Sequence, residues 1–526
     1  MENVYLQSTH QLEVDLPLFG SELICVVNVT RTQPVIDSPA ESRTLIPSRT
    51  LEPGEQYRFH FDMTKCIGCK CCVVACNEQN GNPAAINWRR VGELEGGHYP
   101  CVQRHHLSMG CNHCLEPSCL IGCPVEAYRK DPATGVVLHD PDTCIGCQYC
   151  TWNCSYGVPQ YNAERGVVGK CDLCHNRLAD DLAPACVAAC PEGAIAVEIV
   201  NIEDWRRDYL SANAPGLPSA DDSISTTRVT LPHDLPPDTG RVDTQRIVPE
   251  HPHWPLVFML VLTQLAAGAV AVLNLLNFLD PGPTHPRALI AACMLAGISL
   301  GTATFHLGRP IYAWRALKGL RRSWLSREVL SLSIFAGTAV CYTTGALLQL
   351  PVTPVLSFAT VLSGLIGVLC SARLYMVPAR PAWCSRFTIP EFLATAALLG
   401  PLLVCAIEPE SLDPAYRAWL LRAAAAGGAA QLVIQTMKFL WLSRSEQFEL
   451  RASALLLSGR LQNRFLIRLG ILVLAGIVLP LTTHSHSELV LALALGGEWL
   501  GRWLFFVSVV PKNIAAAFTG SGELAA

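Results

Sequence analysis

Four groups of cysteine residues constrain the fold of this 526-residue chain more than any other feature of its sequence. Each group has three closely spaced cysteines and a fourth that stands apart. The groups are Cys66, Cys69, Cys72 and Cys76; Cys111, Cys114, Cys119 and Cys123; Cys144, Cys147, Cys150 and Cys154; and Cys171, Cys174, Cys186 and Cys190. A Cys-x2-Cys-x2-Cys run wraps around one iron-sulfur cubane, while the cysteine three residues further on reaches another cluster. The sixteen cysteines therefore predict four [4Fe-4S] clusters and a role in electron transfer.

Zinc and disulfide bonds are the two alternatives for these cysteines. Zinc also binds Cys-x2-Cys pairs, but it does not require a third cysteine two residues further on. Disulfide bonds are disfavoured because we expect no export: the sequence from Met1 has no basic region, no apolar core and no twin arginine. Cys71 and Cys101 break the register of the groups and are not assigned as ligands. Five further cysteines are scattered through apolar segments, where cysteine is most often a small hydrophobic residue.

The second half of the chain differs from the first in charge and in hydropathy. Up to Glu250 there are 19 Lys and Arg residues and 32 Asp and Glu residues, whereas from His251 onward there are 20 and 11. The basic half has eight apolar stretches long enough to cross about 30 Å of hydrocarbon. They run approximately over 254–279, 287–307, 328–350, 352–376, 390–407, 416–442, 464–483 and 488–510. Because a bilayer contains no water to satisfy open backbone, we expect eight spanning helices.

The loops between these stretches carry their positive charge on one side. They hold Arg309, Arg315, Lys318, Arg321, Arg322, Arg327, Arg380, Arg386, Arg444, Arg451 and Arg460. Short basic loops stay in the cytoplasm, and an even number of crossings keeps both ends of the bundle with them. We therefore predict a multi-pass protein of the cell inner membrane with its cysteine-rich domain on the cytoplasmic side. The alternative is that the basic loops dock the acidic first half or a partner protein.

Polar residues of the second half indicate a quinone rather than a haem. A transmembrane haem pair needs axial histidines that face each other inside the bilayer. The histidines after residue 254 all lie near the ends of apolar stretches, so no haem is expected; they are His285, His306, His484 and His486. A quinone needs donors to its carbonyl oxygens and a route for protons. The candidates are His306, Arg309, Arg315 and Glu328; the alternative is that they are solvated or snorkelling side chains at the interface.

Residues from about Tyr57 to Val200 resemble the four-cluster iron-sulfur subunit of dimethyl sulfoxide reductase-type molybdoenzymes. The run CIGCQYCTWNCSYGVPQY from Cys144 carries this resemblance. It implies that the outer groups exchange their fourth ligands and that the inner groups do the same. The implied ligand sets are Cys66, Cys69, Cys72 and Cys190; Cys171, Cys174, Cys186 and Cys76; Cys111, Cys114, Cys119 and Cys154; and Cys144, Cys147, Cys150 and Cys123. Some relatives have Trp in the third group and a three-iron cluster, but Cys150 is present here, so four cubanes are expected.

The His-Leu-Gly-x-Pro loop at His306 and the Ser-x-Glu ending at Glu328 resemble the quinol-site region of the same family's anchor subunit. That anchor has eight helices and no haem. The family's basic residue after the proline is only approximately matched by Arg315. His306 and Glu328 are therefore the stronger candidates.

We expect a multi-domain fold: an α+β double ferredoxin-like iron-sulfur domain followed by an all-α eight-helix transmembrane bundle. The predicted parts are an N-terminal extension over 1–56 with a strand-like patch from Glu22 to Val29, the four-cluster domain over 57–200, a linker over 201–253, the membrane anchor over 254–512 and a tail over 513–526. Eight prolines from Asn213 to Pro255 predict that the linker is an extended tether.

The resemblance implies an electron-transfer and anchor subunit, with catalysis on a separate molybdopterin-containing chain that docks on the acidic domain. Membrane lipid and quinone are its other expected partners, and no nucleic acid is expected. A cytoplasmic domain favours sulfite oxidation with quinone reduction. The alternatives are an S-oxide reductase that oxidises quinol, a polysulfide reductase-like module that couples electron flow to ion movement, and a tethered ferredoxin without quinone chemistry. The ion-coupled module predicts buried acids in mid-helix, and only Glu498, near Gly496, Gly497 and Arg502, clearly qualifies.

Overall fold

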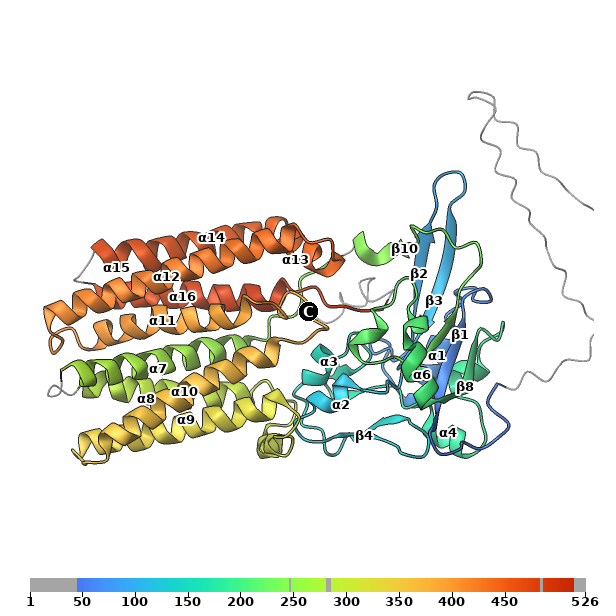
Figure 1. The fold of residues 1–526 in the computed structure, drawn as a ribbon, viewed down its shortest axis with the longest axis horizontal. Coiled ribbons are helices and arrows are strands. Elements are labelled where there is room, and N and C mark those ends of the chain that lie inside the picture. Colours follow the sequence, from blue (N-terminus) through green and yellow to red (C-terminus); the bar gives the residue numbers. More distant parts are fainter. Residues whose placement is uncertain (1–44, 246, 281–284, 483–485, 515–526) are drawn as a thin grey trace, which may run out of the picture.

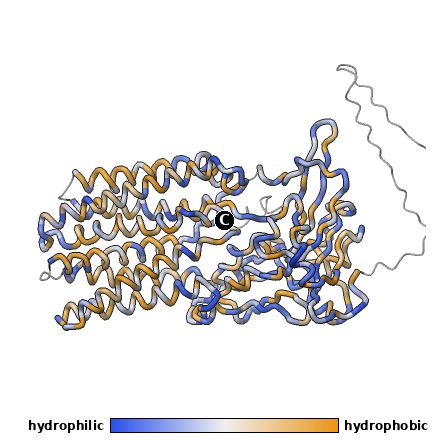
Figure 2. Tube along the Cα trace, viewed as in Figure 1, coloured by the Kyte–Doolittle hydropathy of each residue, from blue (hydrophilic) through white to orange (hydrophobic). Residues whose placement is uncertain are grey.

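The computed structural model describes residues 45–245, 247–280, 285–482 and 486–514. The predicted strand-like patch at 22–29 lies outside these ranges, as do most of the predicted extension and tail. The described chain forms two parts that lie end to end: one has small sheets and short helices, and the other is a bundle of long helices (Figure 1). The long helices are mostly apolar along their length (Figure 2). The predicted order of an α+β domain and an all-α membrane domain is confirmed.

Two three-stranded sheets organise the first part, which we call the cluster domain. In one sheet, β1 (Glu55–Asp62) pairs antiparallel with β8 (Ile195–Asn201), so that the two ends of the cysteine-rich region meet. Alternation along β1 buries Phe59 and Phe61 in the core. The other sheet contains the antiparallel pair β2 (Arg90–Gly96) and β3 (Gln103–Met109). Two short hairpins complete the strands: β4 (Tyr128–Lys130) with β5 (Val137–His139), and β6 (Gln160–Asn162) with β7 (Val167–Gly169).

Short helices follow the cysteine groups. They are α1 (Cys71–Asn80), α2 (Ser118–Gly122), α3 (Tyr149–Asn153), α4 (His175–Ala179) and α5 (Ala185–Ala188). Each is too short to be stable alone in water, so packing and bound groups must hold it. Of these helices, α3 faces the membrane bundle (Figure 1).

The segment 201–253, predicted to be an extended tether, is instead folded onto the cluster domain. After α6 (Ile202–Asp208), β9 (Arg228–Thr230) adds a parallel third strand to β1, and β10 (Gly240–Arg241) adds an antiparallel third strand to β2. Thr226 and Trp205 are buried. The proline-rich composition gives no sign of these strands, because only two or three residues of each take part in pairing. The strands are stabilised by the open edges of β1 and β2.

Seven helical runs among the described residues are long and apolar enough to cross a membrane. They are α7 (Trp254–Leu279), α8 (Pro286–Thr304), α9 (Trp324–Leu347), α10 (Thr353–Tyr375), α11 (Thr388–Ile407), the run of α14 (Gln462–Val473), a π-helical turn (Leu474–Val478) and α15 (Leu479–Thr482), and α16 (Ser487–Val507). The predicted span over 416–442 is also helical, as α12 (Pro414–Ser443), but it carries Arg417, Arg422 and Lys438. A short helix, α13 (Phe448–Ser458), follows it.

The bundle starts and ends at the cluster domain. After α16 the chain returns to that domain, where Lys512 Nζ lies 3.1 Å from the Asp222 carboxylate and Arg241 Nη2 donates to the Ile514 carbonyl at 2.9 Å. Ile514 is buried in the same core as Phe59. α12 has 30 residues, which is long enough to cross a membrane, but it is not among the seven runs that are also apolar enough.

Candidate functional site

Two cavities in the cluster domain are each walled by four cysteines from distant parts of the chain. Cys66, Cys69, Cys72 and Cys190 line one, and Cys111, Cys114, Cys119 and Cys154 line the other. In both, three cysteines come from one sequence group and the fourth comes from another. Gly68 has a φ of +71°, a conformation that lets the chain turn tightly between Cys66 and Cys69.

The remaining eight cysteines form two more sets, recognised from how their thiols influence one another. Burial, and next the charges of Cys171 and Cys186, raise the pKa of Cys174 to about 12. Burial, and next the same neighbours, raise the pKa of Cys76. Burial also raises the pKa values of Cys123, Cys147 and Cys150, and the charge of Cys144 contributes to each of these three shifts. We number the sets as follows: first, Cys66, Cys69, Cys72 and Cys190; second, Cys76, Cys171, Cys174 and Cys186; third, Cys111, Cys114, Cys119 and Cys154; fourth, Cys123, Cys144, Cys147 and Cys150.

These sets suit clusters better than single ions. Within the described ranges, no three His, Cys, Asp or Glu side chains converge on a point that could hold one metal ion. A zinc site would place four ligands about 2.3 Å from one centre, whereas a cubane spreads its thiolates around a larger body. Burial raises the pKa of Cys114 to about 12, so without a bound cation its thiol stays protonated at neutral pH. Ligation by each of these sixteen residues stays a prediction.

Two cations are buried between the cysteine sets. Arg89 donates to Ser108 Oγ at 3.1 Å, and that hydroxyl lies 3.3 Å from Cys72 Sγ. Lys170 Nζ lies 3.8 Å from Cys111 Sγ and donates to the Cys171 carbonyl at 2.6 Å. Both cations are 3% exposed. Lys170 thus lies between the second and third sets, where its charge favours electron-rich sulfur.

α3 connects the fourth set to the membrane bundle. Its Trp152, between Cys150 and Cys154 in sequence, stacks on His306 with ring centroids 6.1 Å apart. His253, just before α7, packs edge-on against both rings, 5.2 Å from Trp152 and 5.0 Å from His306. Burial lowers the pKa of His306 to about 4 and that of His253 to about 2. Both imidazoles are therefore neutral at neutral pH, and His306 Nε2 is buried without a hydrogen-bond partner.

Glu328 lies near the same helix. Its carboxyl group is buried and its Oε1 has no hydrogen-bond partner. It is close enough to the Tyr149 hydroxyl to contribute to the raised pKa of that group, which is caused first by burial. Tyr149, in turn, donates to the Leu374 carbonyl at 2.9 Å. The structure therefore places both stronger candidates, His306 and Glu328, beside α3 with an open polar atom each.

Arg309 and Arg315 form hydrogen bonds across the junction between the bundle and the cluster domain. Arg309 Nη1 donates to the Pro141 carbonyl and Arg315 Nη1 to the Asp142 carbonyl, both at 2.9 Å. These bonds fasten the loop after α8 to the loop before Cys144. Gly308 completes the junction, because any side chain there would clash with the Gly166 carbonyl. The two arginines hold the cluster domain on the bundle.

His253 and Trp152 were missed by sequence reasoning. His253 precedes the first apolar stretch and so falls outside a search for histidines within the membrane. Trp152 lies inside a cysteine group, where only the cysteines draw attention. The available signal was the aromatic content of the His-Pro-His-Trp-Pro run from His251, directly before a spanning helix.

The two unassigned cysteines of the cluster domain differ from each other. Cys71 is exposed and its thiol is influenced by Cys69. Cys101 is disulfide-bonded.

Comparison with known families gives two matches that together cover most of the described residues. Residues 102–199 match the 4Fe-4S dicluster domain. Residues 249–507 match the DMSO reductase anchor subunit (DmsC). The second match covers the seven apolar helical runs and α12, and the first includes the second, third and fourth cysteine groups.

Three relatives illustrate the range of similar proteins. The probable anaerobic dimethyl sulfoxide reductase chain YnfG of Escherichia coli (strain K12) is 41% identical over 175 residues, which are 31% of this chain and 83% of that protein. An anaerobic dimethyl sulfoxide reductase chain of Haemophilus influenzae is 37% identical over 177 residues, 32% of this chain and 85% of that protein. A sulfite dehydrogenase subunit of Allochromatium vinosum is 39% identical over 154 residues, 25% of this chain and 64% of that protein.

Proposed function

Because this polypeptide belongs to the dimethyl sulfoxide reductase family, with an iron-sulfur electron-transfer part and the family's membrane anchor in one chain, we propose that it carries electrons between a membrane quinone and a separate catalytic subunit. In this proposal the four cysteine sets hold four [4Fe-4S] clusters, which pass single electrons when bound. The catalytic partner holds molybdopterin and docks on the cluster domain. The names of the relatives, chains of dimethyl sulfoxide reductases, support a partner subunit.

One observation carries this proposal: α3 lies between the fourth cysteine set and two buried polar side chains of the bundle. His306 offers a neutral ring nitrogen that can hydrogen-bond a quinone carbonyl, and Glu328 offers a carboxyl oxygen that can exchange a proton. Trp152 covers His306 on the cluster side and excludes water from it. Reduction of one quinone takes two electrons from the cluster side and two protons, which Glu328 and solvent supply.

A His306→Ala variant should lose quinone-linked electron transfer by about a hundredfold, because the carbonyl partner at the end of the relay is removed. Iron content and the low-temperature EPR signals of the clusters should stay at wild-type levels. Phe305→Ala is the matched control, since Phe305 is the neighbouring residue and is 79% exposed. Steady-state reduction of a short-chain ubiquinone measures the effect. A His306→Ala protein that turned over quinone at the wild-type rate would contradict the site assignment.

For the direction of electron flow, the proposal is sulfite oxidation with quinone reduction on the cytoplasmic side of the inner membrane. The basic loops after α8, α10 and α12 lie at the same end of the bundle as the cluster domain, which supports this side (Figure 1). The relative named as a sulfite dehydrogenase subunit supports the substrate. The relatives named as dimethyl sulfoxide reductase chains favour the second candidate, S-oxide reduction with quinol oxidation.

One assay separates the two candidates. The complex of this chain with its co-purified catalytic subunit is supplied with sulfite and oxidised ubiquinone-1, and separately with dimethyl sulfoxide and the reduced quinol. Sulfite-dependent quinone reduction is the expected result. Quinol oxidation that depends on dimethyl sulfoxide, with no response to sulfite, would establish the second candidate instead.

A further inference from the structure

At the end of the bundle that meets the cluster domain (Figure 1), the chain between α8 and α9 forms a short 3₁₀-helix, η4 (Pro310–Leu317). Because a 3₁₀-helix has three residues per turn, residues three apart in sequence share a face. One face carries Ala316, which is buried in the same core as Cys123. Directly after the helix, the Gly319 amide donates to the Pro124 carbonyl at 2.8 Å. This face therefore fixes η4 to the cluster domain beside the fourth set.

A second face of η4 is apolar and exposed. It consists of Ile311, Trp314 and Leu317, which are 86%, 64% and 39% exposed. Large apolar side chains that are grouped and exposed in this way mark a surface that contacts a membrane or another protein. The fixed position of the helix means that this face cannot turn inward to bury itself.

The third face of η4 carries cations next to aromatic rings. The guanidinium carbon of Arg315 lies 4.0 Å from the centroid of the Tyr312 ring. One turn later, Lys318 Nζ lies 5.9 Å from the centroid of the Trp314 ring. Tryptophan and tyrosine are enriched where a membrane meets water, and lysine there extends its ammonium group toward the headgroups. The pattern is that of an interfacial segment.

The charge around η4 is positive and partly unpaired. Residues 305–327 include six Lys and Arg residues and no Asp or Glu. Arg322 pairs with Glu126 of the cluster domain at 2.7 Å. Lys318 and Arg321 are exposed, and within the described part of the chain neither forms an ion pair. The surface is therefore complementary to an anion that also has an apolar part.

Exposed apolar side chains of α8 lead along the bundle to η4. Ile290, Met294 and Ile298 follow one another at intervals of four residues and so lie on one face of the helix, and Phe305 follows where the helix ends. Less than half of the residues in the apolar parts of α8 and α9 are buried. The apolar face of η4 thus continues a surface that faces membrane hydrocarbon, which a water-soluble partner could not cover.

We propose that η4 lies in the headgroup layer of the membrane and binds an anionic phospholipid. Ile311, Trp314 and Leu317 contact the upper part of the acyl chains, and Lys318 and Arg321 bind the phosphate. The lipid holds the fourth cysteine set at a constant height above the bilayer. This inference goes beyond the proposed function and does not depend on it, since it requires neither a quinone nor a direction of electron flow.

Lipid titration of the full chain with its clusters tests the proposal. The protein is purified in detergent, and its binding of a fluorescent phosphatidylglycerol and of the matching phosphatidylcholine is measured. The wild type should bind phosphatidylglycerol about tenfold more tightly, and Lys318→Ala combined with Arg321→Ala should remove this preference. The matched control is Arg444→Ala with Arg451→Ala, two exposed arginines of another basic loop, which should keep it. A wild type without preference, or a control pair that loses as much, would reject the site.

A second pair of variants tests the apolar contact. Ile311→Ser combined with Trp314→Ser should weaken the binding of both lipids about tenfold and leave the iron content unchanged, because only exposed side chains are altered. Val355→Ser with Phe358→Ser, an exposed pair on α10, is its control. Equal effects of the two pairs would contradict the proposal.

Three outcomes would assign the surface of η4 to another occupant and overturn the proposal. The first is displacement of phosphatidylglycerol by millimolar inorganic phosphate, which would indicate a site for a free anion. The second is a dimer of this chain that the Ile311→Ser and Trp314→Ser pair converts to a monomer. The third is loss of lipid binding in the complex with the co-purified catalytic subunit.

Discussion

A Cys154→Ala variant is expected to lose or alter the cluster of the third set while the fourth keeps its own. In sequence, Cys154 belongs to the same group as Cys144, Cys147 and Cys150, but it lines the cavity of Cys111, Cys114 and Cys119. Removing its thiolate leaves three ligands for that cluster, and about four of the roughly sixteen irons become labile. Electron transfer through the chain should then stop, because the relay is interrupted between the second and fourth sets.

Comparison of variants decides which cluster is affected. The low-temperature EPR signal that changes in Cys154→Ala should be the one that changes in Cys111→Ala, and it should survive in Cys147→Ala. Cys71→Ala is the control, since Cys71 is exposed and belongs to no set. Should Cys154→Ala and Cys147→Ala share their altered signal instead, the exchange of ligands between groups would be wrong.

Replacement of Lys170 by methionine should lower the reduction potentials of the clusters in the second and third sets. A reduced cluster carries one more negative charge than an oxidised one, and the buried Lys170 Nζ lies 3.8 Å from Cys111 Sγ. Coulomb's law at an effective dielectric constant of about 20 gives a shift on the order of 50–100 mV for a one-electron couple. Such a shift would slow uphill steps of the relay.

Redox titration followed by EPR measures this effect without reference to turnover. Arg129→Met removes a charge from the exposed side of β4 and should leave all potentials within the error of the titration, because water screens that charge. Potentials that stay unchanged in Lys170→Met would mean that the buried cation is neutralised by another group.

The cysteine groups could be predicted from local spacing, because a few neighbouring residues are enough to place three thiolates on one turn of backbone. Which groups exchange their fourth ligands could not come from spacing: Cys190 is far from Cys66 in sequence, and only the pairing of β1 with β8 brings their segments together. A resemblance to a known family had to supply it. The seven long apolar helical runs were likewise readable from apolar length alone.

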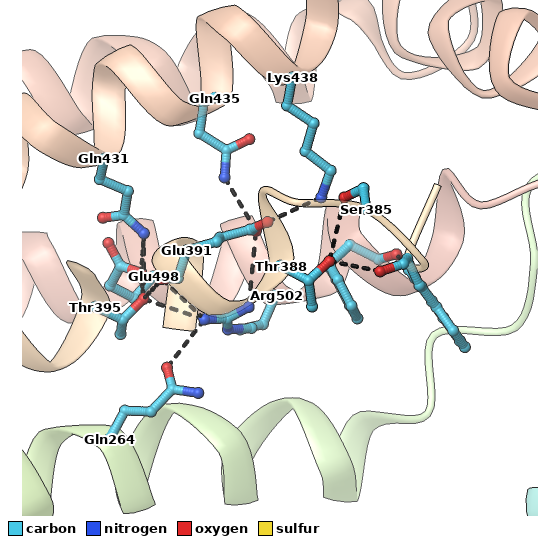
Figure 3. A network of polar contacts seen from close by, with 12 residues as sticks. Gln264, Ser385, Thr388, Glu391, Thr395, Gln431, Gln435, Lys438, Glu498 and Arg502 are labelled. Atoms are coloured by element: carbon cyan, nitrogen blue, oxygen red, sulfur yellow. Dashed lines mark hydrogen bonds and ion pairs between the residues drawn. The ribbon is translucent and has the colours of Figure 1, made fainter. Parts of the chain in front are cut away.

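Features that depend on contacts between distant segments were missed or misjudged. The prediction of an extended tether over 201–253 was wrong, because β9 and β10 form by pairing with the edges of existing sheets and not because of their own composition. His253 and Trp152 gain meaning only when α3 packs on the bundle. Glu391 was not singled out from the sequence, because its partner Lys438 comes from another helix (Figure 3). Such residues are recognised by their partners, which a single sequence does not reveal.

The position of Ile514 constrains the order in which the cluster domain and the membrane bundle assemble. This residue follows the last membrane helix, yet its side chain fills the core of the cluster domain beside Phe59. During synthesis the domain encoded first therefore lacks a piece of its interior until every crossing has been made. The cluster domain is therefore translated early, but its core is completed late. Closure of that core therefore has to wait until the last membrane helix has been made.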